Sequence, residues 1–299
     1  MWLILAFFSA ALLGTYEVFK KLALNNNAVI PVLFLNTVFC SLLFLPVILL
    51  SRFAPDTMEG TLFYIPRANA ITHLYIALKS VIVLSSWVFA YFAMKHLPIT
   101  IAGTIRASQP VLTLLGALLI FGERLNFYQW TGVIVSVISF FMLSSAGRKE
   151  GIRFSHNKWI YFIVLATITG SCSALYDKYL LSHGFDRMVV QVWYTYYQML
   201  IMAVILYIWY RNRKETTPFE WRPSIFFISF FLVAADFIYF YALSFPDSMI
   251  SIVSMARRSG VVVSFLFGAL FFHEKNIRSK AIDLLLVLLG MYFLYLGTR

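Results

Sequence analysis

Long apolar runs separated by short polar connections dominate this sequence. Each run holds about 20 residues, the length that an α-helix needs to cross the hydrocarbon core of a bilayer. Apolar and polar positions do not alternate within the runs, so they predict helices rather than the strands of a membrane barrel. We predict ten membrane spans: Trp2–Leu22, Val29–Leu50, Ile71–Met94, Ile99–Phe121, Phe127–Ser145, Trp159–Leu181, Met188–Tyr210, Ser224–Leu243, Met249–Phe272 and Ala281–Leu296.

The composition excludes a water-soluble fold. Hydrophobic residues make up 61% of the 299 residues and charged residues only 12%, whereas soluble domains carry about 25% charged residues. The connections between the runs are too short to hold another domain. The sequence therefore predicts an all-α polytopic membrane protein with ten transmembrane helices, whose surroundings are the lipid bilayer.

The distribution of basic residues predicts the orientation of the chain. Of the 24 Lys and Arg residues, fourteen fall on one side of the membrane, in connections or, for Lys20 and Lys21, at the span end next to one, and five fall in connections on the other side. Because basic connections stay in the cytoplasm, both termini are expected outside it. The net charge of +11 is explained by these connections, so nucleic acid is not an expected partner.

The two halves of the chain repeat the same polar landmarks in the same order. The matches are Gly116 and Glu123 with Gly268 and Glu274, Arg106 with the pair Arg257-Arg258, and Tyr16-Glu17 with Tyr176-Asp177. Each half has five spans, an odd number, so the halves must enter the membrane in opposite senses. We expect a first five-helix repeat at 1–146, a connecting loop at 147–158 and a second five-helix repeat at 159–299.

These features resemble the ten-span, EamA-type members of the drug/metabolite transporter superfamily. The resemblance rests on the Gly-to-Glu endings of the fourth and ninth spans, on Pro110, and on Tyr-Glu-Val-Phe-Lys-Lys at residues 16–21. It implies a secondary transporter in which the first, third, fourth, sixth, eighth and ninth spans line a central cavity. Val261-Val262 stand where Pro110 would recur, so the resemblance does not imply that both halves move identically.

Charged side chains inside the predicted spans mark the candidate site. A charge at mid-membrane costs about 2.5–3.5 kcal/mol on insertion scales, so it usually faces a cavity or a partner. Apart from Asp283, all of them lie on the six spans named above, and four aromatic residues near them complete the set. The candidate substrate-binding residues are Tyr16, Lys79, Trp87, Arg106, Tyr176, Asp236, Tyr239, Arg257 and Arg258, and the candidate proton-coupling residues are Glu17 and Asp177.

Some of these charges also have ordinary structural explanations. Glu17 with a lysine three or four residues later fits a helical ion pair, and Lys178 fits a side chain that reaches to the membrane surface. Arg257 and Arg258 point about 100° apart on a helix, so one of them is expected to be structural.

The balance of these charges favours an anionic or amphoteric solute. Five basic residues in the cavity spans face three acidic ones, which leaves two positive charges unmatched. Arginine can hold a carboxylate with two hydrogen bonds, and a carboxylate that gains and loses a proton can couple transport to a proton gradient. We therefore expect a secondary active transporter for an amino acid-like metabolite or organic anion, working by alternating access, with protons as the coupling ion. Its expected location is the inner membrane of a bacterium, as a monomer or homodimer.

An intramembrane enzyme and a channel or scaffold are the alternatives. Tyr176-Asp177 is like half of an intramembrane aspartyl protease site, but the second aspartate lies in Val-Ala-Ala-Asp236 without the expected glycines. The five histidines form no closely spaced pair that would ligate a metal, and no phosphate-binding loop is present. We expect no catalytic residues, no cofactor and no metal.

Overall fold

The computed structural model describes residues 2–121, 126–128, 130–132, 134–135, 138–139, 142, 156–211, 217–245, 248, 253, 256–271 and 277–297. Over this part of the chain the backbone forms helices and turns but no strand. The prediction of an all-helical chain is confirmed over these residues.

Among the residues that the structure describes, six helices are long and apolar enough to cross a membrane. Each coincides with a predicted span to within three residues at either end, so these six spans are confirmed as helices of that length and composition. They are α1 (Trp2–Leu24), α2 (Val29–Phe53), α4 (Ala70–His96), α8 (Lys158–Ser182), α9 (Arg187–Arg211) and α10 (Ser224–Leu243). The short helix α3 (Pro55–Met58) lies in the connection between α2 and α4.

Polar caps fix where three of these helices begin. The side chain of Asn69 accepts a hydrogen bond from the Thr72 backbone N–H at 2.8 Å, and Asn157 does the same for Trp159 at 2.9 Å. Asp186 accepts from the N–H groups at the start of α9. These caps satisfy backbone donors that have no partner within the helix.

The predicted fourth span is two helices rather than one. It is divided into α5 (Ile99–Ala107) and α6 (Gln109–Phe121) by a turn at Ser108. Pro110 has no N–H to donate to the carbonyl of Arg106, which removes one bond of a continuous helix. The Ser108 hydroxyl instead donates to the carbonyl of Ile105 at 2.6 Å.

The same break recurs in the ninth span without a proline. Residues 256–258 are helical, Ser259 and Gly260 form a turn, and α12 (Val261–Leu270) follows. The Ser259 hydroxyl donates to the carbonyl of Ala256 at 2.6 Å, the same bond that Ser108 makes. The two halves are thus alike at this position although only one carries a proline.

The remaining predicted spans are described only in part. The helix α13 (Ile277–Leu296) covers the predicted tenth span. Much of the predicted fifth span, the first residues of the ninth, Glu123, Glu274 and most of the connecting loop lie outside the described residues. The count of ten helices therefore stays a prediction.

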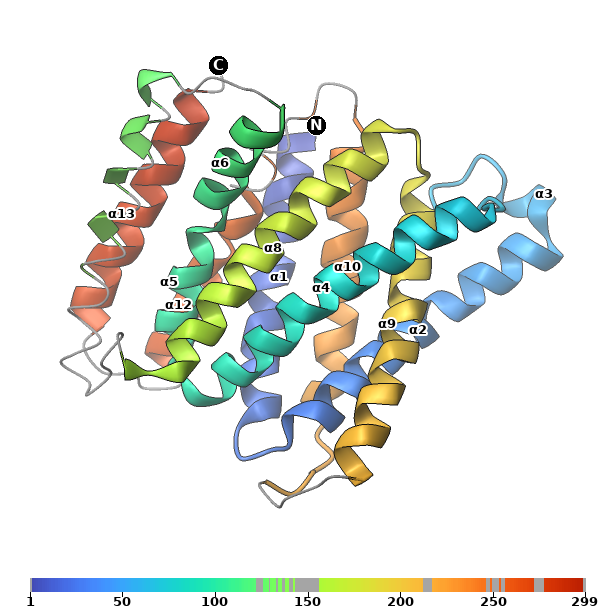
Figure 1. The fold of residues 1–299 in the computed structure, drawn as a ribbon, viewed down its shortest axis with the longest axis horizontal. Coiled ribbons are helices and arrows are strands. Elements are labelled where there is room, and N and C mark those ends of the chain that lie inside the picture. Colours follow the sequence, from blue (N-terminus) through green and yellow to red (C-terminus); the bar gives the residue numbers. More distant parts are fainter. Residues whose placement is uncertain are drawn as a thin grey trace.

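The two halves run in opposite directions and pack into each other. Figure 1 shows α1 starting at the end of the molecule where both termini lie, whereas α8 starts at the opposite end. The most extensive helix contacts join different halves: α1 with α10, α4 with α8, and α2 with α9. The centre of the fold is therefore formed jointly by both halves.

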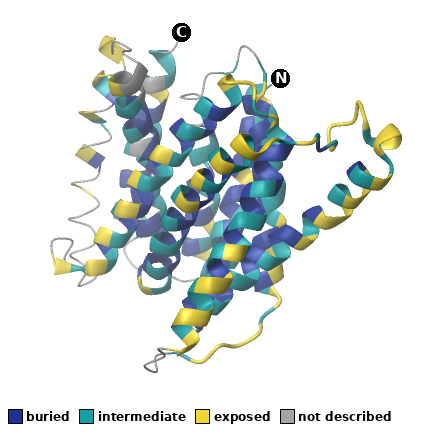
Figure 2. Ribbon diagram, turned by 45° about the vertical axis from the view of Figure 1, so that its right-hand side comes forward, coloured by how far each residue is buried: buried dark blue, intermediate teal, exposed yellow. Residues whose placement is uncertain are grey.

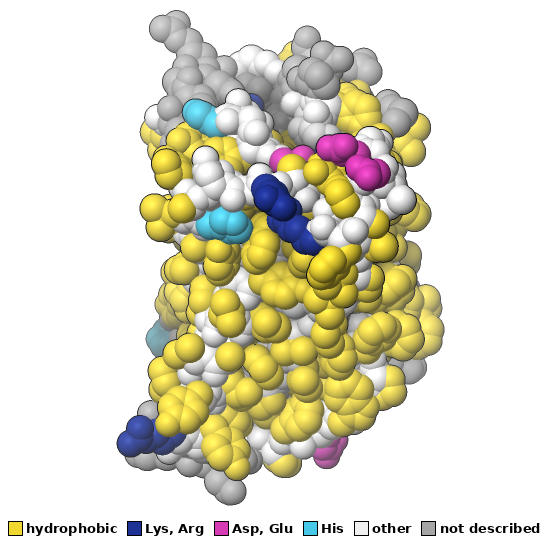
Figure 3. All heavy atoms as spheres, turned by 90° about the vertical axis from the view of Figure 1, so that its right-hand side faces the viewer, with side chains coloured by type: hydrophobic (Ala, Val, Ile, Leu, Met, Phe, Trp, Pro, Cys, Tyr) yellow, Lys and Arg dark blue, Asp and Glu magenta, His cyan; other side chains and the backbone are white. Residues whose placement is uncertain are grey.

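The outer face of the bundle is apolar. Figure 2 shows buried positions where helices face one another and exposed positions on the outside. Large apolar side chains such as Leu74 and Val204 are exposed. Figure 3 shows a broad band of hydrophobic side chains with charged side chains at its two ends. Such a band is the surface that a lipid-embedded protein presents.

Candidate functional site

A narrow cavity of about 90 Å³ lies between the two halves. Its lining side chains come from α1, α4, α5, α6, α8, α9 and α10 and from the helical turn that precedes α12. Space of this size holds only a few water molecules, so a metabolite needs the cavity to widen. The walls combine apolar side chains with several charged ones.

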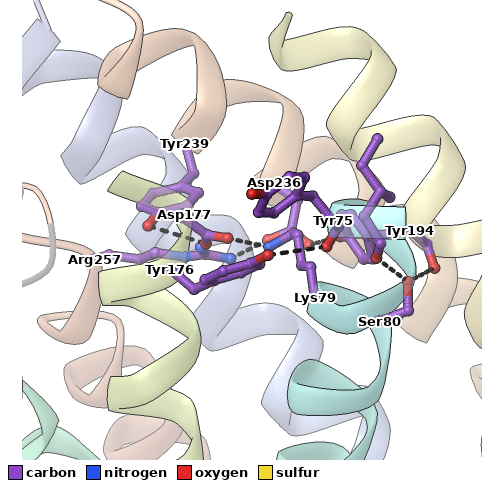
Figure 4. Close-up of polar contacts among 10 residues, drawn as sticks. Tyr75, Lys79, Ser80, Tyr176, Asp177, Tyr194, Asp236, Tyr239 and Arg257 are labelled. Carbon is purple, nitrogen blue, oxygen red and sulfur yellow. Dashed lines mark hydrogen bonds and ion pairs between the residues drawn. The ribbon is translucent and has the colours of Figure 1, made fainter. Parts of the chain in front are cut away.

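Lys79 and Asp177 form a buried ion pair in the cavity wall, between α4 and α8 (Figure 4). The Tyr239 hydroxyl donates to the second oxygen of Asp177 at 3.4 Å. The Lys79 ammonium also lies 4.8 Å from the centre of the Tyr194 ring and 5.1 Å from that of Phe240. Because the lysine is only 2% exposed, this carboxylate and these rings replace the water it has lost.

Asp236 on α10 joins a second cluster. It pairs with Arg257 through one oxygen and accepts a hydrogen bond from the Tyr194 hydroxyl at 2.6 Å through the other. The Arg257 guanidinium stacks over Tyr239 at 4.1 Å from the ring centre. Tyr239 and Tyr194 thus each touch both clusters, so the two ion pairs are linked through two aromatic side chains (Figure 4).

Glu17 on α1 forms the third cluster. One oxygen accepts from Arg106 Nη1 at 2.7 Å, and the other pairs with Lys20 one turn later. Lys20 is fully buried, with its ammonium 4.6 Å from the centre of the Tyr16 ring and 5.4 Å from that of Tyr91. Two cations therefore share one carboxylate here.

Arg258 differs from the other charged residues of the cavity. Within the described part of the chain its side chain makes no ion pair and no hydrogen bond. The charged residues that share a smaller adjoining cavity of about 30 Å³ with it are Arg106, Arg257 and Glu17. All three arginines also line the central cavity.

Comparison with known proteins places the chain in a family. The model of the EamA-like transporter family matches residues 1–145 and again residues 157–296. The chain belongs to the EamA-like transporter family. Members are transporters of small molecules across membranes, so this EamA-like protein is a multi-pass membrane protein of that kind, as its apolar helices also indicate.

A comparison with solved structures adds the fold alone. A solved protein crystal structure superposes on this EamA-like chain with a TM-score of 0.66 at 13% sequence identity, covering 99% of this chain and 98% of the other. No curated protein matches the sequence significantly.

The structure brings most of the predicted site residues of this EamA-like protein together. Glu17 lines the smaller adjoining cavity. Tyr176 lines neither the central cavity nor the smaller one, and its hydroxyl donates to the carbonyl of Tyr75 at 3.2 Å. Lys178 lines a separate hollow near Arg187. The predicted residues that line the central cavity are Tyr16, Lys79, Trp87, Arg106, Asp177, Asp236, Tyr239, Arg257 and Arg258.

Three residues of the site were missed by the sequence reasoning. Tyr194 lies on a span without charges, so nothing in the pattern set it apart. Lys20 was considered only as one of two lysines that could pair with Glu17 along the helix; that pair forms, and Lys20 is fully buried. Gln109 lines the cavity with a buried carbonyl oxygen that accepts no hydrogen bond from the described residues. A polar residue directly after the break of the fourth span was the available signal for Gln109.

Proposed function

We propose that the protein is a secondary active transporter in the inner membrane of a bacterium. Its proposed substrate is a small organic anion or amino acid-like metabolite, moved by alternating access between the two halves. The proposed coupling ion is the proton, and the working form is a monomer or homodimer.

The arrangement of Arg106, Arg257 and Arg258 around one cavity carries this proposal. A guanidinium group can give two parallel hydrogen bonds to a carboxylate or phosphate. Arg106 uses only Nη1 on Glu17, and its buried Nε donates to no described residue. Donors therefore remain for an anionic group, whereas a cation would meet only repulsion at this wall.

The Glu17–Arg106 pair supports proton coupling. An anion that binds Arg106 takes the place of Glu17 as its partner. Glu17 then has less positive charge beside it. Because it is also largely buried, it binds a proton more readily. Asp177 stands in the same relation to Lys79. Anion and proton would then enter together and leave together.

Uptake by proteoliposomes that contain the purified protein tests this proposal. A panel of labelled organic anions, amino acids and permanent cations is offered with and without an acidic exterior. We expect an anion or amino acid to accumulate, and the proton gradient to raise the level reached. An enzyme would convert the solute, and a channel would equilibrate it without accumulation.

Arg106→Ala should abolish accumulation while the amount of reconstituted protein stays the same. Arg278→Ala is the matched control, because Arg278 is exposed at the start of α13 and lines neither cavity. Transport of permanent cations alone, or normal transport by Arg106→Ala, would contradict the proposed substrate class.

A further inference from the structure

We propose that Arg106 and Arg258 together bind a doubly negative group, so that the substrate is an organic dianion such as a phosphate monoester or a dicarboxylate. This inference rests on the proposed function, since it narrows the substrate of the same cavity. It follows from how the charges in and beside the cavity are distributed among the ion pairs.

Four basic residues are either matched by an acid of their own or share one. Asp177 is engaged by Lys79 and Asp236 by Arg257, so each of these two pairs is neutral. Glu17 serves both Arg106 and Lys20 and can neutralise only one of them. The Glu17 cluster therefore keeps one positive charge.

Arg258 supplies a second positive charge. It makes no ion pair among the described residues, and the like-charged Arg106 and Arg257 line the same two cavities. The positions of the predicted spans that the structure does not describe contain no Asp or Glu, and Asp283, the remaining acid of the spans, lines neither cavity. Uncompensated charge is unfavourable in a buried, low-dielectric setting.

One charge of the positive excess thus lies on Arg258, and the other is shared by Arg106 and Lys20. Arg106 and Arg258 line the same two cavities. A zwitterion leaves this excess unchanged, and a monoanion removes half of it. A dianion removes all of it, with charge-assisted hydrogen bonds to both guanidinium groups. The charge count therefore selects a dianion over the other anions that the proposed function allows.

The rest of the cavity suits a short carbon skeleton with a hydroxyl group. Trp87, Val83 and Leu232 offer apolar surface. The Gln109 side-chain oxygen, which accepts no bond from the described residues, is available to a hydroxyl donor.

Binding to the purified full chain tests this inference by isothermal titration at about pH 8, where a phosphate monoester carries close to two charges. The probes are alanine, lactate, malate and glycerol 3-phosphate. We expect at least one of the two dianions to bind at least about tenfold tighter than lactate. One additional hydrogen bond between charged groups is enough to give an affinity ratio of about this size. A preference for glycerol 3-phosphate identifies a phosphate site, and a preference for malate identifies a dicarboxylate site.

Arg258→Gln should bring the affinity for the dianion down to that for lactate, while lactate binding changes little. Arg278→Gln is the matched control and should leave both affinities unchanged. Arg258→Lys keeps the charge and should keep the preference for dianions, which covers the case in which Arg258→Gln fails to fold.

Equal affinities for lactate and the dianions would overturn the inference and leave the proposed transport of anions standing. An equal loss of lactate and dianion binding in Arg258→Gln would also overturn it. Uptake in proteoliposomes limited to cations would overturn the proposed function itself.

Discussion

The backbones of Gly14 on α1 and Gly260 at the break of the ninth span are in direct contact. A Cβ atom on Gly14 would overlap the carbonyl oxygen of Gly260 and the side chain of Val263. The position that corresponds to Gly260 in the first half is Gln109, whose side chain lies against Gly170 of α8. Where Gly14 meets Gly260, the two halves therefore touch through backbone. Where α6 meets α8 at Gly170, the Gln109 side chain lies between them.

Gly14→Ala should destabilise the protein by about 1–3 kcal/mol, because the added methyl group meets backbone that cannot move aside cheaply. The gain in helix propensity from replacing glycine is smaller, at about 1 kcal/mol. The free energy of unfolding in detergent measures the effect. Ala11→Val is the control, since it adds methyl groups to an exposed position of the same helix. Equal stability of Gly14→Ala and the parent would mean that the two helices separate freely here.

Asp236→Asn should cost about 3–5 kcal/mol of stability, because it leaves Arg257 as a buried charge without its carboxylate. Arg257→Gln alone should cost a similar amount for the same reason. The double variant Asp236→Asn/Arg257→Gln should be more stable than the sum of the two losses predicts, because no unpaired charge remains. A double-mutant cycle on the free energy of unfolding measures this coupling, and strictly additive losses would contradict the pairing.

Glu17→Gln should flatten the pH dependence of transport if Glu17 carries the coupled proton. The neutral amide cannot titrate, and it no longer competes with the substrate for Arg106. Initial uptake rates at several external pH values measure the effect, with Asp177→Asn compared in parallel. A pH profile that neither substitution alters would show that another ion or the solute gradient drives transport.

A reporter fused after Arg299 should be found outside the cytoplasm, and one inserted at 148–153 should be found inside it. The reason is the excess of basic residues in the connections on the second side. Paired enzymatic reporters, each active on one side only, give the measurement. A cytoplasmic C-terminus would reverse the orientation and leave the antiparallel relation of α1 and α8 intact.

The long helices could be predicted from the sequence because length and apolar content suffice to define a span. The turn at Ser108 could not, because hydropathy averages over many residues and a single interrupted turn changes it little. Pro110 indicated a bend in the fourth span, but no proline marks the matching turn at Ser259. There the serine hydroxyl bonds a carbonyl of the preceding turn, a contact that composition does not reveal.

Part of the candidate site could be predicted because charges inside apolar runs are rare and conspicuous. Their partners could not, because pairing depends on how helices cross. The position of Lys20 near the end of α1 predicts an exposed side chain, yet its ammonium lies over the rings of Tyr16 and Tyr91. Tyr194 reaches Asp236 only because α9 packs beside α10.

The packing of each half into the other has a consequence for synthesis of the chain. Lys79 is made almost a hundred residues before Asp177, and Asp236 reaches Arg257 only late in the second half. When the ribosome has finished the first half of the chain, Lys79 has neither its carboxylate nor the ring of Tyr194. The first half must therefore wait in the membrane with charges that water or the insertion machinery shields, and final folding begins only when α8, α9 and α10 arrive.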